Sequence, residues 1–169
     1  MTMNILSNSR EGVIVELDPC IDDRLCVAKV LTGGKLKKNL HSRLRRLDPQ
    51  GDRFAEYKSV PITDVLSKSQ RKRIECVSGS GLKSTVLLSP TYEKMDPKRL
   101  NKRQYRHLRD SIELLASKKI AHLDLPGNVM LNACTGLPVI IDFAEGKLNA
   151  DKTDLQIDRN SFLTQFKRG

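Results

Sequence analysis

Apolar and β-branched residues form two short runs near the start of the chain, GVIVEL at 12–17 and RLCVAKVL at 24–31. Runs of this length and composition predict β-strands. The DPCIDD segment between them supplies the Pro and Asp residues that turns favour. The two strands are therefore expected to pair as a hairpin.

A helical period follows in KLKKNLHSRLRRL, where leucines recur every three or four residues. This spacing predicts an amphipathic helix with a strongly basic outer face. The DPQGD segment after it carries the Pro and Gly that commonly end a helix. The leucines of the apolar stripe are Leu36, Leu40, Leu44 and Leu47.

The middle of the chain is less regular. Residues 61–73, PITDVLSKSQRKR, are compatible with either a short helix or a loop. Two further strands are expected at 73–79, RIECVSG, and at 84–90, STVLLSP, around the SGSGLK segment.

A long helix is predicted to begin at MDPKRL, because Asp96 can cap it and Pro97 suits the first helical position. It is expected to end near Lys118 or Lys119. Its apolar stripe consists of Leu100, Leu108, Ile112 and Leu115.

Two short strands, NVML at 128–131 and PVIID at 138–142, are expected next, and a short terminal helix is expected within 148–166. Strands and a helix come first, then more strands, then a long helix that leads into loops. This order predicts an α+β fold with a mainly antiparallel sheet in its first part.

Composition limits the class of protein. The chain has 169 residues, of which 38% are hydrophobic, so it can bury a core as one domain or two small lobes. No apolar run approaches the roughly 20 residues of a membrane-spanning helix, and no basic-then-apolar leader opens the chain. We therefore expect the protein inside a cell, or inside a particle assembled there.

The four cysteines, Cys20, Cys26, Cys76 and Cys134, include no CxxC pair. A zinc site is not expected from this spacing. The interpretation that follows is four reduced, mostly buried thiols.

The formal net charge is +10, and basic residues cluster in GGKLKKNLHSRLRR, SKSQRKR and KRLNKRQYRHLR. Such clusters attract polyanions, including nucleic acid and acidic proteins, and they also occur as solvated helix faces. Aromatic residues make up 4% of the chain and Trp is absent. This composition does not favour a platform on which single-stranded bases stack.

Acids and one amide stand where the short strands of the second half begin or end. Asp124 and Asn128 flank a tight LPG turn, and Asp142 ends the PVIID strand. If the two strands are neighbours, these residues gather two carboxylates and an amide oxygen, which are ligands that suit Mg²⁺. Lys29, within the VAKV strand, could reach a phosphate. A turn or capping role explains each acid better when it is taken alone.

Taken together, the motifs resemble the protein kinase family. HLDLPGN is similar to the catalytic-loop signature H-R-D-L-x-x-x-N, DFA is similar to D-F-G, and VAKV is similar to the V-A-I-K strand. The likeness runs from about residue 12 to residue 146. It implies a reduced two-lobe fold, in which 1–92 is an N-lobe-like sheet with a helix and 93–169 is a truncated helical C-lobe with the catalytic-loop-like and DFG-like segments.

The resemblance also implies roles for individual residues. Asp124 would orient a substrate hydroxyl and accept its proton, and Asn128 and Asp142 would bind Mg²⁺. His122 would be a buried support of the loop rather than a base.

In the first lobe, Lys29 would hold the α- and β-phosphates of ATP, and Gly12 would belong to the strand-turn that covers the phosphates. The implied cofactors are therefore ATP and Mg²⁺.

Several parts of the family pattern are missing. Of the glycine-rich loop only Gly12 remains, and helix 35–47 has no acid to pair with Lys29, so Glu56 or another acid would have to replace it. The catalytic loop is one residue shorter than in the family, with Leu123 in place of Arg. Ala144 replaces the Gly of D-F-G, which restricts the backbone there. The helices that normally hold a peptide substrate are not expected in the short stretch after this motif.

The RLDPQGDRF segment resembles the IDPxGxxF of kinase-like proteins from large DNA viruses. The first expectation is a reduced Ser/Thr-type phosphotransferase or a pseudokinase, in the host cytoplasm or the virion. The second is a non-catalytic structural component of a virus particle, with acidic proteins or virion components as partners. The third is a small basic nucleic-acid-binding domain.

Overall fold

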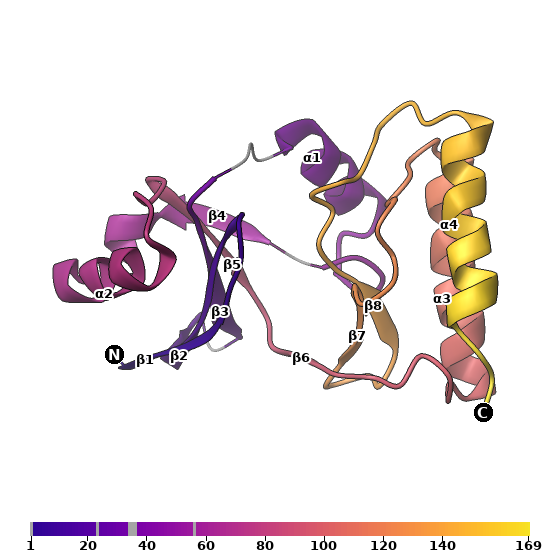
Figure 1. Ribbon diagram of the computed structural model, residues 1–169. Helices are drawn as coiled ribbons and strands as arrows, with labels where there is room; N and C mark the ends of the chain where they lie inside the picture. Colours follow the sequence, from indigo (N-terminus) through magenta and orange to yellow (C-terminus); the bar gives the residue numbers. More distant parts are fainter. Residues whose placement is uncertain (1, 23, 34–36, 56) are drawn as a thin grey trace. The chain divides into compact units, whose positions relative to one another are not determined.

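The computed structural model describes residues 2–22, 24–33, 37–55 and 57–169. Leu36 and Glu56, which entered the sequence-based predictions, lie outside these residues. The chain forms two compact units, one of Met1–Leu36 with Glu56–Thr91 and one of Lys37–Ala55 with Tyr92–Gly169. Each unit combines helices with an antiparallel sheet (Figure 1), so the α+β class is confirmed. Residues 37–55 belong to the second unit, whereas the sequence-based division placed them in the first.

The first unit is built on a five-stranded antiparallel sheet in the order β1-β2-β3-β5-β4. The expected hairpin at its centre is confirmed, and its first strand runs four residues beyond the predicted end. Two strands, β1 and β4, were not predicted. The strands are β1 (Thr2–Asn8), β2 (Gly12–Ile21), β3 (Leu25–Leu31), β4 (Lys58–Pro61) and β5 (Thr85–Ser89).

One face of this sheet is covered by the short 3-10 helix η1 (Ile62–Asp64) and by α2 (Lys68–Ser78) (Figure 1). Alternating strand residues such as Val13, Val30 and Val86 are fully buried there. Alternation places them on the same side of the pleated sheet. They form one core with the helical Ile74.

The prediction of a strand at 73–79 was wrong, because these residues belong to α2. Ser67 and Gln70 form a reciprocal capping box at the start of this helix, and Gly79 ends it with a φ of 68°. Only Ile74 of the helix is buried. The apolar residues of RIECVSG were too few to reveal the helical period, whereas the capping signal of Ser67, six residues before Arg73, was readable.

The second unit contains three α-helices and a three-stranded antiparallel sheet in the order β6-β7-β8. Helices α3 and α4 lie side by side (Figure 1). The elements are α1 (Lys38–Leu47), β6 (Tyr92–Glu93), α3 (Lys102–Ser117), β7 (Val129–Asn132), β8 (Pro138–Ile140) and α4 (Lys152–Gln165).

The helical stripe predicted for α3 is buried in the core of this unit, together with residues of α1 and α4. The predicted start of the helix was wrong. Asn101 caps it in a reciprocal box with Gln104, whereas Asp96 accepts a hydrogen bond from the backbone N–H of Lys98 in the preceding turn. An Asn with Gln three residues later satisfies two helix-end groups at once, so it competes well with the Asp-Pro signal.

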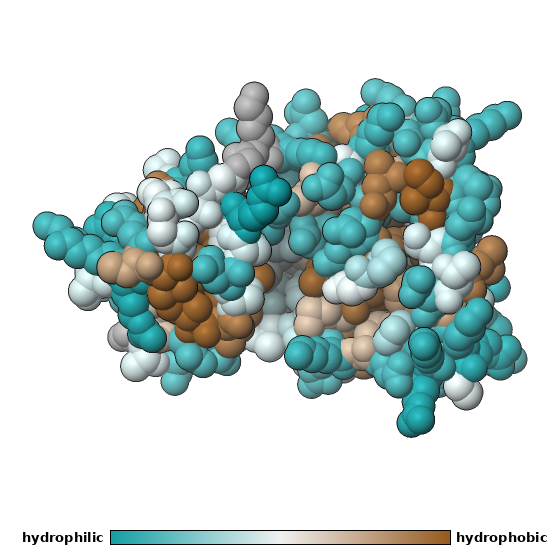
Figure 2. Space-filling view, viewed as in Figure 1, coloured by the Kyte–Doolittle hydropathy of each residue, from teal (hydrophilic) through white to brown (hydrophobic). Residues whose placement is uncertain are grey.

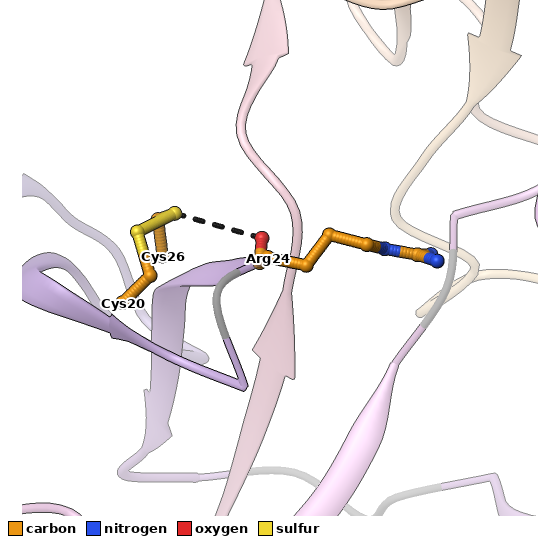
Figure 3. Close-up of a disulfide and its surroundings, with 3 residues drawn as sticks. All are labelled: Cys20, Arg24 and Cys26. Carbon is orange, nitrogen blue, oxygen red and sulfur yellow. Dashed lines mark hydrogen bonds between the residues drawn. A yellow bond between two sulfur atoms is a disulfide. The ribbon is translucent and has the colours of Figure 1, made fainter.

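The expectation of four reduced, mostly buried cysteines was wrong. Cys20 and Cys26 form a disulfide across the β2–β3 hairpin, and Cys76 and Cys134 are exposed (Figure 3). The pairing of Ile21 with Leu25 places the two half-cystines opposite each other on adjacent strands. Six residues separate the two cysteines in the sequence, and this spacing alone did not indicate that they lie opposite each other.

No helix within the described part of the chain is long and apolar enough to cross a bilayer.

Candidate functional site

The predicted catalytic-loop and metal-loop residues meet at one end of the β7–β8 hairpin. The register pairs Val129 with Ile140, so the chain before β7 and the chain after β8 leave the hairpin at the same end. The backbone N–H of Ile141 donates to the carbonyl of Asn128 over 2.8 Å. This bond ties the two loops together within the second unit.

His122 crosslinks the same two loops. It is fully buried, and its Nδ1 accepts a hydrogen bond from the backbone N–H of Asp124 at 3.1 Å. The tautomer is thereby fixed with the proton on Nε2, which donates to the carbonyl of Ile141 at 2.7 Å. The ring also packs edge-on against Phe143, with centroids 4.7 Å apart. With both nitrogens engaged, the imidazole holds the loops and has no proton-accepting atom to offer a substrate.

The carboxylate of Asp124 is exposed to solvent. Asn128 Nδ2 donates to the backbone carbonyl of Asp124 at 2.6 Å and to its Oδ2 at 3.1 Å. These bonds fix the carboxylate on the LPG turn, where Gly127 has a φ of 80°. They also turn Nδ2 of Asn128 toward Asp124, which leaves the amide oxygen as the atom available to a cation.

Asp142 follows β8 in a left-handed conformation, with a φ of 54°. Its Oδ1 accepts a hydrogen bond from the backbone N–H of Ala144 at 3.3 Å. A non-glycine residue with positive φ is uncommon and costs free energy unless its surroundings enforce it. The strand on one side and the buried Phe143 on the other hold the residue in this conformation.

Asp158 of α4 holds the start of this loop in place. The sequence analysis did not identify this residue. Its side chain is 3% exposed. Its two oxygens accept hydrogen bonds from the backbone N–H groups of His122 at 2.7 Å and Leu123 at 2.8 Å. The sequence could have indicated Asp158 through its position four residues before Phe162 and eight before Phe166. This spacing places it on the buried face of the helix.

Two ion pairs hold α4 in place beside this carboxylate. Arg159 donates to both carboxylate oxygens of Glu113 on α3 at 3.0 Å, and this guanidinium lowers the pKa of that carboxyl. Lys147 lies 2.9 Å from Asp154 in the first turn of α4, and its hydrogen bond lowers the pKa of Asp154.

The RLDPQGDRF segment, at the end of α1, supports β8, the strand before Asp142. The carboxylate of Asp48 accepts hydrogen bonds from the backbone N–H groups of Asp52, Arg53 and Phe54 at 2.8–3.0 Å. Phe54 is buried and meets Phe143 edge-on at 5.9 Å. The segment pairs with Ile140 through backbone hydrogen bonds of 2.9 Å on each side.

Lys29 and Gly12 belong to the first unit. Lys29 projects from β3, and its Nζ lies 3.4 Å from Oε2 of Glu11. Glu11 thus pairs with the strand lysine. At Gly12 a Cβ would overlap the backbone carbonyl of Val30, so close strand packing itself demands a glycine at this position.

The structure therefore brings together four of the predicted residues, His122, Asp124, Asn128 and Asp142, within the second unit. Their oxygen donors are two carboxylates and an amide, which is a set that fits Mg²⁺. Among the described residues, no three His, Cys, Asp or Glu side chains are grouped closely enough to hold a metal ion by themselves. A cation at this site would therefore depend on phosphate oxygens or water for its remaining ligands.

Comparison with known proteins finds no family model that matches this chain and no curated protein that matches it.

Proposed function

We propose that this chain is a reduced, protein kinase-like phosphotransferase that binds Mg-ATP and acts on Ser or Thr hydroxyls. The observation that carries the proposal is the hydrogen bonding between the two loops, in which Asn128 bonds both to Asp124 and to Ile141, the residue before Asp142. Turn or capping roles taken separately do not require this hydrogen bonding. The likeness of RLDPQGDRF to viral kinase-like proteins extends the proposal to a large DNA virus as the source.

Asp124 is suited to the task of a proton acceptor. One of its oxygens is engaged by Asn128, and Oδ1 has no partner among the described residues. A hydroxyl that approaches this oxygen can donate its proton there as its own oxygen becomes the nucleophile. The hydrogen bonds from Asn128 restrict the carboxylate and so lower the entropic cost of orienting it.

Asn128 and Asp142 are the residues that would hold Mg²⁺, and Lys29 would contact the phosphates. Bound Mg²⁺ supplies charge neutralisation on the phosphate oxygens. The contribution of the chain is positioning: β7 and β8 fix the two loops, while Glu11 orients the amine of Lys29.

The test is a thermal melt of the full chain with and without Mg-ATP. Nucleotide at about 100 times its Kd should stabilise the folded state by about 2.7 kcal/mol. Asp142→Asn should abolish this shift, and Asp110→Asn, which changes an exposed carboxylate of α3, should preserve it.

Asp124→Asn separates binding from chemistry. This variant should keep the Mg-ATP shift and lose transfer of labelled γ-phosphate to a Ser/Thr protein substrate. If the wild-type chain shows no shift with Mg-ATP, or if Asp142→Asn retains it, the proposal is refuted.

A second function, polyanion binding, is favoured by one surface. Exposed basic residues of α3 recur at helical spacing on one face, at Lys102, Arg103, Arg106 and Arg109. Such a face suits nucleic acid or an acidic protein. Binding of a duplex or single-stranded oligonucleotide should then weaken steeply with salt and should be unaffected by Asp142→Asn.

A further inference from the structure

A groove of about 400 Å³ opens in the second unit beside the loop that carries Asp124. Its walls come from the chain after β6, the turn of the catalytic loop, β7 and the end of α4. Figure 2 shows tan and brown atoms exposed over β7 and around β6, bordered by hydrophilic side chains. The residues that give it an apolar character include Met95, Pro97, Pro126, Met130 and Phe166. The volume is within the range of sites that enclose one or a few side chains.

The groove adjoins the atoms that would accept a substrate proton. Pro126 and Gly127 line it and also form the turn between Asp124 and Asn128. A Cβ at Gly127 would meet nothing within 4 Å, so there is open space beside this turn. An extended peptide advances about 3.3 Å per residue, so a peptide with its hydroxyl at Asp124 can extend a nearby side chain toward the groove.

The charge of the side chains that line the groove indicates which kind of ligand it binds. Lys94 is the charged side chain that lines the groove; it is exposed and has no ion-pair partner among the described residues. A segment with an apolar side chain for the walls and a carboxylate for Lys94 satisfies both features.

We propose that this groove binds an acidic peptide segment of a protein substrate, with an apolar side chain seated between Met130 and Phe166 and a carboxylate at Lys94. The inference rests on the proposed phosphotransferase function, since it names the substrate class of that site. It assigns substrate specificity to the groove beside the turn between Asp124 and Asn128.

The experiment measures binding of a fluorescent peptide to the full chain by anisotropy, without nucleotide. The peptide carries a Ser, a Leu two residues away and Glu residues on both sides. Lys94→Glu should weaken its binding about tenfold, because a favourable charge contact becomes a repulsive one. Lys98→Glu makes the same change at an exposed residue that does not line the groove, and it should change the affinity less than about twofold.

Two matched peptides complete the design. Replacing Leu by Ser should weaken binding to the wild-type chain, and replacing Glu by Lys should weaken it for wild type and restore it for Lys94→Glu. Equal affinity for all three peptides, or no saturable binding, overturns the proposal. So does a single-stranded oligonucleotide that binds in a Lys94-dependent way while the peptides do not.

Thermal melts with Mg-ATP on the same samples distinguish the two proposals. A nucleotide shift without peptide binding overturns the groove alone. Peptide binding without a nucleotide shift supports the groove as a docking site and overturns the phosphotransferase.

Discussion

Replacing Asp158 by Asn tests whether α4 holds the loop that begins at His122. The carboxylate is 3% exposed and accepts two backbone N–H groups, from His122 and Leu123, at 2.7 and 2.8 Å. Asn is nearly the same size, so packing is preserved. It has one acceptor oxygen, and its NH₂ group would face an N–H donor in place of the second oxygen.

The magnitude follows from these contacts. Hydrogen bonds to a charged group contribute about 1.5–3 kcal/mol each, and a buried donor left without a partner costs about 1–3 kcal/mol. The substitution removes one bond, weakens the other by removing the charge, and leaves one buried N–H unsatisfied. We expect the second unit to lose about 3 kcal/mol of unfolding free energy, which is a large fraction of the stability of a small domain.

Amide hydrogen exchange by NMR localises the effect. In Asp158→Asn the amides of His122 and Leu123 should exchange about 100-fold faster, since each 1.4 kcal/mol is a factor of ten. Urea unfolding followed by circular dichroism should show the same loss. Asp110→Asn, an exposed acid with the same chemical change, should alter stability by less than about 0.5 kcal/mol. Unchanged exchange at both amides would refute the anchoring role.

Three further predictions concern the disulfide, a histidine and a glycine. Replacing Cys20 and Cys26 together by Ser should lower the unfolding free energy of the first unit by about 2 kcal/mol for so short a closed loop, and so lower its urea midpoint. An unchanged midpoint after chemical reduction of the wild type would contradict this. Burial lowers the pKa of His107 from its ordinary 6.5, so the unfolded chain takes up the proton first. Stability should therefore fall as the pH is lowered through about 6.5, the ordinary pKa of the unfolded state, and thermal melts of His107→Gln should show a flatter pH profile than wild type. Gly12→Ala should cost about 1–3 kcal/mol, because its Cβ would overlap a carbonyl of β3, whereas Gly81→Ala, whose Cβ meets nothing within 4 Å, should be near neutral in urea unfolding.

Strong hydrophobic periodicity allowed much of the fold to be predicted. The β2–β3 hairpin, α1 and α3 each carry a run or stripe that fits a single period, and all three are present. Strand β1 escaped prediction because it is a half-exposed edge strand with polar residues at Thr2, Asn4 and Ser7. Such a strand is specified by its pairing with β2 rather than by its own composition.

The loops of the candidate site could also be predicted only in part from the sequence. Short motifs indicated His122, Asp124, Asn128 and Asp142, and the register of β7 and β8 then brought them together. Asp158 could not be found in that way, because its partners are backbone N–H groups 35 and 36 residues distant in sequence. Backbone donors carry no residue signature, so only the burial of the acid could have drawn attention to it.

The lysine of β3 shows how a missing motif residue can be replaced. The sequence suggested that Lys29 lacks an ion-pair partner, because the first helix contains no acid. Glu11 takes that role from the chain just before β2, at 3.4 Å from Nζ. Strong charge-assisted bonds are shorter, about 2.7–2.9 Å, so the contact between Glu11 and Lys29 is a loose ion pair. The departure in the helix is therefore a weak argument against nucleotide binding. The departures from the kinase pattern that bear most directly on metal binding are the shortened loop and Ala144. They alter the backbone that carries Asn128 and Asp142.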